Sequence, residues 1–272
     1  MEMINLDQCT PCETQGHSSK GNQLKFKRNG YWYKADHMGY EGLAEVIVSR
    51  LLQHSNITNF VVYEPAMIEY KGIIYKGCKS LNFLQADEEL VTVDHLYRQY
   101  TGLSLTSELS RINTTRERVA FFVQVIQNFT GLKDFGKYLS LILELDAFFF
   151  NEDRHTNNIA LKYNSKVKQY LPCHIFDNGL ALFADTSTDF IQGTTVAECT
   201  SRIQAKPFAF DFDEQADEAV GLYGRQLNFT FQMSDVIKEL GKFHDIYEEW
   251  ILDRIEDTLR QQMRKYQYLF HQ

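Results

Sequence analysis

The sequence lacks two features that would place it in large and familiar protein classes. It has no excess of positive charge, because 36 acidic and 28 basic residues give a net charge of −8. Nucleic-acid phosphates are bound by clustered Lys and Arg, so this balance argues against a nucleic-acid partner. No apolar run approaches the roughly 20 residues that cross a bilayer. Glu144 and Asp146 interrupt the densest run, residues 139–150, and we expect no membrane span.

A secretory signal and a disulfide pattern are also missing. Residues 1–8 hold no basic segment followed by an apolar one, so we expect a cytoplasmic protein. Five scattered cysteines, an odd number, are typical of reduced thiols. Cys9 and Cys12 form a lone C-x-x-C without the second pair that a zinc site needs, and we interpret them as part of an N-terminal tail.

What the sequence does have is enough apolar residues to fold along nearly its whole length. Of its 272 residues, 44% are hydrophobic and 14% are aromatic, unlike the composition of disordered chains. A chain of this length begins to split into two domains. We predict an α+β fold with two lobes: a β-rich N-lobe over residues 1–86 and a mainly helical C-lobe over residues 87–272.

Hydrophobic periodicity locates the elements of both lobes. Alternating residues around Asn29-Gly30 predict a hairpin, with Trp32 and Lys34 on one face of its second strand. A helix follows, and then two strands around a second turn. In the C-lobe we expect two helices, a hairpin with a polar turn, and a closing helical region broken at Gly241. The expected ranges are 40–54 for the N-lobe helix, 61–77 for the strand pair with a turn at 71–72, 116–129 and 136–149 for the C-lobe helices, 159–161 and 171–176 for the hairpin, and 234–270 for the closing region.

The most informative pattern is the segment Asn151–Asn158 followed by Phe176–Gly179. Asp153 precedes Asn158 by five residues, and Asp177 comes after the predicted hairpin, which would bring the three side chains together. Phosphoryl transfer needs a carboxylate to orient the attacking hydroxyl, and an amide and a carboxylate to hold Mg²⁺. We therefore predict an ATP- and Mg²⁺-dependent kinase with Asp153 as the base and Asn158 and Asp177 as metal ligands. The alternative is that both aspartates only stabilise turns.

A second stretch imitates this chemistry in the wrong place. Asp134-Phe135-Gly136 spells the magnesium-binding triplet of protein kinases, but it precedes Asp153 and introduces a helix. We interpret Asp134 as the N-terminal cap of that helix. Metal binding is therefore assigned to Asp177.

Lys34 is the candidate cation for the nucleotide phosphates, and it needs a carboxylate partner. The following helix offers Glu41 and Glu45. Glu45 shares a helical face with Val48, so we favour it, whereas Glu41 lies in the first turn, where acids complement the helix dipole. The alternative is that Lys34 is an exposed strand lysine.

A short polar segment before the first hairpin could cover phosphates with its backbone N–H groups. A plain entry loop would have the same composition. Its residues are Ser18, Ser19, Lys20, Gly21 and Asn22.

The motif Asn-x-Asp-Arg-His-x-x-Asn-Ile, with Phe-Asp-Asn-Gly, resembles that of the HipA-like serine/threonine kinases of bacteria, which share the loop with phosphatidylinositol kinases. Residues 20–25 resemble that family's phosphate-covering loop, residues 78–84 the approach to its hinge, and residues 205–208 a C-lobe segment. The resemblance extends from about residue 18 to 223 and implies a protein-kinase-like fold with two lobes.

The resemblance implies the same roles for Asp153, Asn158 and Asp177, and contact between Lys34 and ATP. It gives His155 a place near the γ-phosphate or in bracing the loop, and makes Ser18 or Ser19 a candidate autophosphorylation site. The implied substrate is a protein. An antitoxin-like partner is a further candidate, although this chain begins almost at the phosphate loop and has no room for the extra N-terminal subdomain of full-length HipA.

Two other functions fit the same motifs. A lipid kinase should carry basic residues for anionic headgroups, worth about 1 kcal/mol each, and the net charge of −8 counts against it. A pseudokinase would bind nucleotide or a partner without catalysis. The intact set of Lys34, Asp153, Asn158 and Asp177 disfavours that function.

Overall fold

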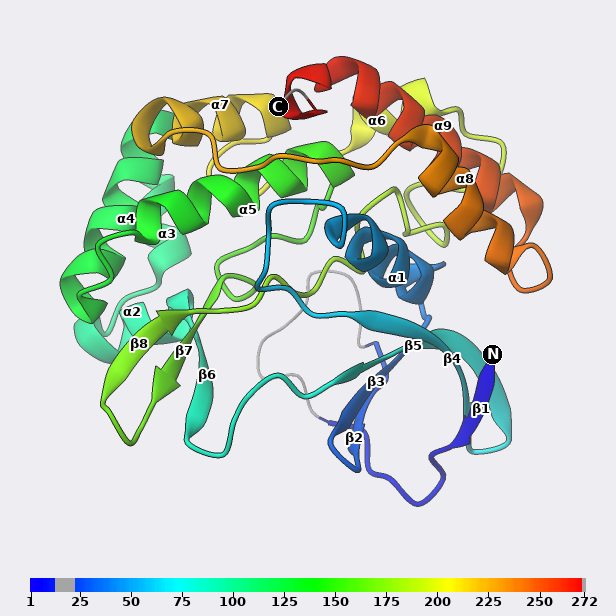
Figure 1. The fold of residues 1–272 in the computed structure, drawn as a ribbon. Coiled ribbons are helices and arrows are strands. Elements are labelled where there is room, and N and C mark those ends of the chain that lie inside the picture. Colours follow the sequence, from blue (N-terminus) through cyan, green and yellow to red (C-terminus); the bar gives the residue numbers. More distant parts are fainter. Residues whose placement is uncertain (13–22, 271–272) are drawn as a thin grey trace. The chain divides into compact units, whose positions relative to one another are not determined.

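The computed structural model describes residues 1–12 and 23–270, which form two compact units (Figure 1). Unit 1 comprises Met1–Asn82, Phe176–Ile203 and Asn228–Gln272, and unit 2 comprises Phe83–Ile175 and Gln204–Leu227. The α+β fold class is confirmed, since strands dominate the first third of the chain and helices most of the rest. The lobe boundary at residue 86 stays a prediction.

The sheet of unit 1 has five strands within the described residues, in the order β1-β4-β5-β3-β2. The Asn-Gly hairpin is confirmed: Asn29 and Gly30 both have positive φ, 51° and 80°, as a two-residue type I′ turn requires. Lys71 and Gly72 repeat this pattern between the next two strands. The strands are β1 (Glu2–Asn5), β2 (Lys25–Arg28), β3 (Tyr31–Ala35), β4 (Tyr63–Tyr70) and β5 (Ile73–Leu81).

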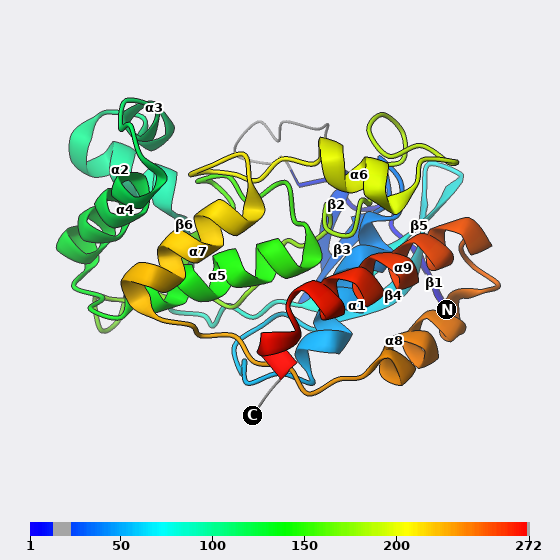
Figure 2. The same cartoon turned by 90° about the horizontal axis from the view of Figure 1, so that it is seen from above.

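The two faces of this sheet differ in what they bury. One face carries an apolar core that includes Phe26, Tyr33 and Ile68. On the other face helix α1 (Glu41–Leu52) packs against β3, β4 and β5 (Figure 2). A Cβ at Gly42 would lie 2.6 Å from the backbone of Gly77, so only glycine lets the helix come this close.

The remaining helices of unit 1 come from the last part of the chain. Helix α9 packs against α6 and α8, and α8 also contacts α1. The break expected at Gly241 is confirmed, because α8 ends at Leu240 and a 3-10 turn begins at Gly241. The elements are α6 (Val196–Arg202), α8 (Met233–Leu240), η1 (Gly241–Phe243), α9 (Glu249–Lys265) and η2 (Gln267–Phe270).

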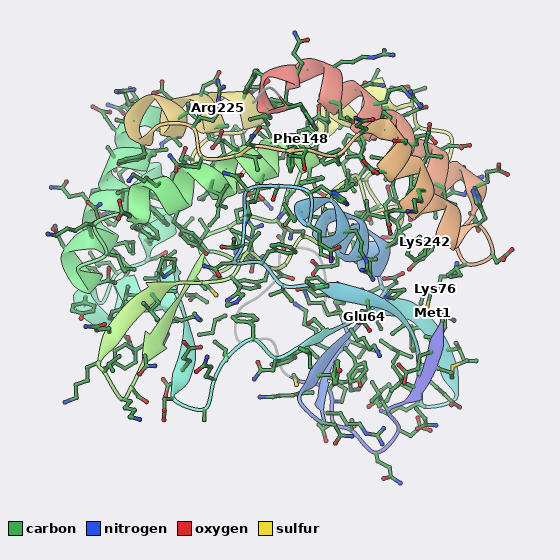
Figure 3. The ribbon with its side chains drawn as sticks, in the orientation of Figure 1. Met1, Glu64, Lys76, Phe148, Arg225 and Lys242 are labelled. Atoms are coloured by element: carbon green, nitrogen blue, oxygen red, sulfur yellow. The ribbon has the colours of Figure 1, made fainter. Side chains whose placement is uncertain are left out.

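Unit 2 contains five helices and three strands among its described residues, and its strands form one antiparallel sheet in the order β6-β7-β8. Helix α5 is almost wholly buried and carries Phe148, labelled in Figure 3, which packs edge-on against Phe149. Both predicted C-lobe helices and the predicted hairpin are confirmed. The elements are β6 (Glu88–Thr92), α2 (Val93–Thr101), α3 (Leu105–Ser110), α4 (Thr115–Thr130), α5 (Phe135–Phe149), β7 (Ala160–Asn164), β8 (Gln169–Pro172) and α7 (Phe212–Tyr223).

Two short strands were not expected. The first element after Asp87 is strand β6 and not a helix. The segment interpreted as an N-terminal tail contains β1, which pairs in parallel with β4. Neither strand is joined to its pairing partner by a tight turn, so no turn signal such as Asn29-Gly30 marks it. Cys12 follows β1, and its backbone N–H donates to the carbonyl of Lys25 at 2.7 Å.

No helix in the described part of the chain is long and apolar enough to cross a membrane.

Candidate active site

Three charged side chains from separate elements meet in unit 1. Lys34 on β3 places its Nζ in contact with Glu45 Oε1 on α1 and 2.7 Å from Asp177 Oδ1. Lys34 is 8% exposed and Glu45 is fully buried. A buried charge is stable only with a partner of opposite sign, so this lysine is not the exposed strand residue of the alternative interpretation.

The surroundings of Lys34 keep it charged. Burial lowers its pKa, but the Asp177 and Glu45 carboxylates outweigh burial and hold the pKa well above the ordinary value. The Lys34 ammonium also lies 3.4 Å from the Tyr63 hydroxyl and 5.1 Å from the centre of its ring. Lys25 Nζ is 3.8 Å from Asp177 Oδ1, which gives this carboxylate a second cation.

Glu45, and not Glu41, is the partner of Lys34. Its second oxygen, Oε2, accepts the backbone N–H of Asn178 at 2.9 Å, so one side chain ties α1 to both Lys34 and the residue after Asp177. Glu41 instead accepts backbone N–H groups of residues 37–39, which lie just before its own helix. The first-turn position predicted for Glu41 therefore has a local role.

The segment after Asp177 is fixed against the start of α1. Asp177 has a φ of 61°, in the left-handed region that non-glycine residues rarely adopt. Tyr40 donates its hydroxyl proton to the Leu182 carbonyl at 2.6 Å, and the backbone N–H of Tyr40 donates to Ala184 at 3.2 Å. Residues 181–185 are fully buried. These contacts fix the chain shortly after Asp177.

In unit 2 the predicted catalytic loop follows α5 directly. Asn158 Nδ2 donates to the Asp153 carbonyl at 2.8 Å and to Asp153 Oδ2 at 3.1 Å. The Asp153 N–H donates to Asn151 Oδ1 at 3.3 Å. The amide nitrogen of Asn158 therefore faces Asp153, and its amide oxygen points the other way.

His155 has a defined tautomer in this loop. Its Nδ1 accepts the backbone N–H of Asn157 at 3.2 Å, so the proton of the neutral ring lies on Nε2. Nε2 is buried, makes no hydrogen bond among the described residues, and lies 3.7 Å from Asp153 Oδ1. The ring therefore presents a donor beside the candidate base.

A buried ion pair connects the loop to α5. Arg154 Nε lies 2.9 Å from Asp146 Oδ2, and Arg154 NH2 lies 3.1 Å from Oδ1. The two residues are 2% and 1% exposed. Burial raises the pKa of Asp146, and Arg154 offsets part of that rise. Because a guanidinium keeps its charge in proteins, the pair is ionic.

The site predicted from the sequence is thus described in two parts. Lys34, Glu45 and Asp177 come together in unit 1, and Asp153, His155 and Asn158 come together in unit 2. The meeting of Asp177 with Asp153 and Asn158 stays a prediction. The phosphate-covering loop, Ser18–Asn22, lies outside the described residues.

The structure also describes the imitating triplet at Asp134. Asp134 occupies the N-cap position of α5, as expected, but its side chain makes no capping hydrogen bond. Its carboxylate instead lies 3.0 Å from Lys137 Nζ, and both side chains are largely exposed. The backbone ψ of 12° at Asp134 is outside the extended range that a capping side chain needs, so the capping prediction was wrong in this detail.

The donor chemistry of the proposed ligands fits magnesium. No cluster of three or more His, Cys, Asp or Glu side chains suited to a metal ion occurs in the described part of the chain. Mg²⁺ is usually bound by one or two protein oxygens together with substrate phosphates and water. An Asp177 carboxylate oxygen and the Asn158 amide oxygen are groups of that kind.

Several residues of these clusters could not be found from sequence. Gly42 and Gly77 let α1 approach β5 closely, and Tyr63 contacts Lys34 from β4. Nothing in their local sequence indicates these contacts. Asp146 did leave a signal: a carboxylate in a buried apolar helix must have a partner. Its partner, Arg154, is eight residues away in the loop itself.

Comparison with known proteins gives a match among solved structures. No protein-family model and none of the curated proteins matches this chain. Among solved structures, it is similar to the crystal structure of the Helicobacter pylori proinflammatory kinase CtkA, with a TM-score of 0.59 over 98% of this chain and 96% of that one. Sequence identity is 14%, so the likeness concerns the fold. The chain has a protein-kinase-like α+β fold.

Proposed function

We propose that this protein is an ATP- and Mg²⁺-dependent kinase of the HipA-like type, which transfers the γ-phosphate to a Ser or Thr hydroxyl of a protein. The observation that carries the proposal is the buried contact of Lys34 with both Glu45 and Asp177. A lysine held between a helix carboxylate and the proposed metal aspartate is the arrangement that phosphate binding in a kinase needs. The protein-kinase-like fold supports it.

Each candidate residue has a distinct task in this proposal. Lys34, oriented by Glu45, contacts the nucleotide phosphates, and Asp153 accepts the proton of the attacking hydroxyl. Asn158 and Asp177 hold the metal ion through their oxygens. Bound Mg²⁺ would neutralise charge on the phosphates. The Asn158 contact with Asp153 keeps the base and the ligand in one fixed relation.

His155 supplies a proton donor next to the base. Its Nε2–H is buried and lies 3.7 Å from Asp153 Oδ1. A neutral imidazole donor can stabilise negative charge on a transferred phosphoryl oxygen without competing for the proton that Asp153 accepts. We therefore assign His155 to charge stabilisation.

The proposed acceptor is a protein because the resemblance to HipA-like kinases covers more of the chain than the loop shared with lipid kinases. The net charge of −8 also disfavours an anionic lipid surface. Ser18 and Ser19, in the proposed phosphate-covering loop, are the candidate sites of autophosphorylation.

The test is incubation of the full chain with Mg-ATP, alone, with generic protein acceptors, and with vesicles containing phosphatidylinositol. Phosphate incorporation is followed by intact mass, and the modified peptide is identified by mapping. We expect phosphate on a Ser or Thr of the chain or of an added protein. Asp153→Asn and Asp177→Asn should each lower it by at least about 100-fold.

Asp134→Asn is the matched control, because Asp134 belongs to the imitating Asp-Phe-Gly triplet and should retain full transfer. Phosphate only on lipid would instead assign a lipid kinase. Nucleotide binding without transfer to any acceptor would assign a pseudokinase. Loss of transfer in Asp134→Asn, with Asp177→Asn active, would reverse the metal assignment.

A further inference from the structure

We infer that Arg154 and Asp146 are positioning residues for the catalytic loop: the ion pair sets the place of Asp153 and Asn158 without contacting substrate. This inference rests on the proposed function of those two residues. It extends that function by naming the support that fixes the loop to α5.

The arginine connects α5 to the far end of the loop. Its Nε and NH2 groups bind the two Asp146 carboxylate oxygens at 2.9 and 3.1 Å, which is a bidentate contact. Its remaining nitrogen, NH1, donates to the Asn158 carbonyl at 3.0 Å. One side chain therefore joins the last turn of α5 to the far end of the loop.

Asp146 has a second contact that fixes the near end. Its backbone carbonyl accepts the N–H of Phe150, the C-terminal cap of α5, and that of Asn151 at 3.0 Å. Phe150 has a φ of 54°, so the chain turns sharply where the helix ends. Asp146 thus holds the start of the loop through its backbone and the end through Arg154.

The position of Arg154 in the sequence makes this contact important for the chemistry. It lies between Asp153 and His155, so a shift of its backbone moves both. The hydrogen bonds among Asp153, His155 and Asn158 run within the loop. These hydrogen bonds preserve the shape of the loop, and the ion pair of Arg154 with Asp146 fixes the position of the loop relative to α5.

Lysine could not replace the arginine. A guanidinium presents five N–H donors in a planar fork, and here it contacts two carboxylate oxygens and a carbonyl in different directions. An ammonium on a flexible stem cannot reproduce both contacts at once. Arg154→Lys therefore keeps the charge and removes the geometry.

Replacement of Arg154 should change the response to Mg²⁺ most, because Asn158 is a proposed metal ligand. Residues that orient metal ligands usually change metal affinity or activity by about 10- to 100-fold when replaced. We expect Arg154→Lys to raise the Mg²⁺ concentration for half-maximal transfer and to lower kcat within that range. ATP affinity measured without Mg²⁺ should stay near the wild-type value.

The experiment compares four full-length proteins: wild type, Arg154→Lys, Asp146→Asn, and the double variant Asp146→Leu/Arg154→Met. The double variant replaces the buried pair with apolar side chains, a change that often preserves stability. Each protein is measured for transfer against Mg²⁺ concentration, and for hydrogen exchange of the amides of residues 151–158. We expect all three variants to need more Mg²⁺ for half-maximal transfer and to show faster exchange of the loop amides.

Arg118→Lys is the matched control. Arg118 also binds carbonyl oxygens in unit 2, those of Ile112 at 2.9 Å and Phe208 at 2.7 Å, but it lies outside the loop. Its replacement should affect stability without changing the Mg²⁺ dependence or the exchange of residues 151–158.

The two readouts separate this inference from the proposed function. If wild type transfers no phosphate, the proposed function fails, and loop exchange alone then decides whether the ion pair positions the loop. Exchange of residues 151–158 in the folded double variant at the wild-type rate would overturn the inference. So would a loss of transfer in Arg118→Lys as large as that in Arg154→Lys.

Discussion

The two groups of candidate residues are held in place by different means. In unit 1, Lys34, Glu45 and Asp177 hold one another, so the charges that form the site also stabilise it. In unit 2, Asp153 and Asn158 are supported by a separate pair, Asp146 and Arg154. If phosphates and a metal bind as proposed, unit 1 must therefore exchange internal contacts. In unit 2 the support is independent of the chemistry.

The largest effects are expected when one charge is removed from each group. Lys34→Met leaves Glu45 and Asp177 without their shared cation, and breaking a buried ion pair costs about 3–5 kcal/mol of stability. Asp153→Asn should lower transfer by about 10²- to 10⁴-fold. Its free energy of unfolding should change by less than about 1 kcal/mol. Urea unfolding and a phosphate-transfer assay measure both effects.

Lys25→Met serves as the control for charge. Its ammonium is 3.8 Å from Asp177 and more exposed than that of Lys34, so its loss should cost far less stability. Equal destabilisation by Lys34→Met and Asp153→Asn would show that the two groups are supported alike, contrary to the comparison.

Each unit also contains a carboxyl group whose pKa is raised, chiefly by burial. Burial, with the nearby Glu41, raises the pKa of Asp36 from 3.8 to about 7, although Gly42, Tyr247 and Lys76 act against the rise. A raised pKa in the folded state favours the protonated form. The stability contributed by Asp36 is therefore complete below about pH 4 and is lost as the pH rises through about 7. The upper bound is about 4 kcal/mol.

In unit 2 burial raises the pKa of Glu144 from 4.5 to about 7, against the N–H groups of Gln226 and Leu227 and the charge of Arg225, which Figure 3 labels. The stability contributed by Glu144 is therefore also lost as the pH rises through about 7. Asp36→Asn and Glu144→Gln should each flatten the pH dependence of unfolding between about pH 5 and 8. A slope unchanged in Asp36→Asn would mean that this carboxyl is ionised throughout.

A smaller effect is expected from a methyl group at two helical glycines. A Cβ at Gly42 would lie 2.6 Å from the Gly77 backbone, and one at Gly136 would lie 2.4 Å from the Tyr223 ring. Alanine favours a helix by about 1 kcal/mol, so a net loss reports crowding, which typically costs about 1–3 kcal/mol. Gly42→Ala should shift α1 and lower transfer, because Glu45 lies on that helix. Gly136→Ala should lower stability and leave transfer unchanged.

Thermal unfolding and phosphate-transfer assays on Gly42→Ala and Gly136→Ala measure both effects. Gly241→Ala is the control, since no atom lies within 4 Å of a Cβ there. Full transfer by Gly42→Ala would show that the contact between α1 and β5 does not set the place of Glu45.

The sequence predicted the parts of this molecule that depend on local chemistry. The Asn29-Gly30 turn, the apolar helix before Asn151 and the inward face of Glu45 follow from spacing and conformational preference alone. What it could not predict depends on contacts between distant residues, such as the β1–β4 pairing or the approach of Gly42 to Gly77. The ion pair of Asp146 and Arg154 lies between these cases, because burial of a charged residue indicates that a partner exists without naming it.

The smallest predicted effect concerns the link between α1 and the end of the chain. Tyr247, between η1 and α9, donates its hydroxyl proton to Asp36 Oδ2 at 2.8 Å, and Asp36 Oδ1 accepts the N–H of Gly42 on α1. Lys76, labelled in Figure 3, lies 4.8 Å from the Tyr247 ring. Tyr247→Phe removes one hydrogen bond and keeps the ring, so it should cost about 1 kcal/mol of stability.

This variant also tests how rigidly unit 1 holds α1. If Asp36 transmits the contact, Tyr247→Phe should weaken ATP binding slightly, because Asp36 also binds the start of the helix that carries Glu45. Tyr100→Phe, at a tyrosine that is 57% exposed in unit 2, should change neither stability nor binding. Wild-type ATP affinity in a destabilised Tyr247→Phe protein would show that Asp36 does not help to fix Glu45, and that the contacts of Glu45 with Lys34 and Asn178 are sufficient to hold it.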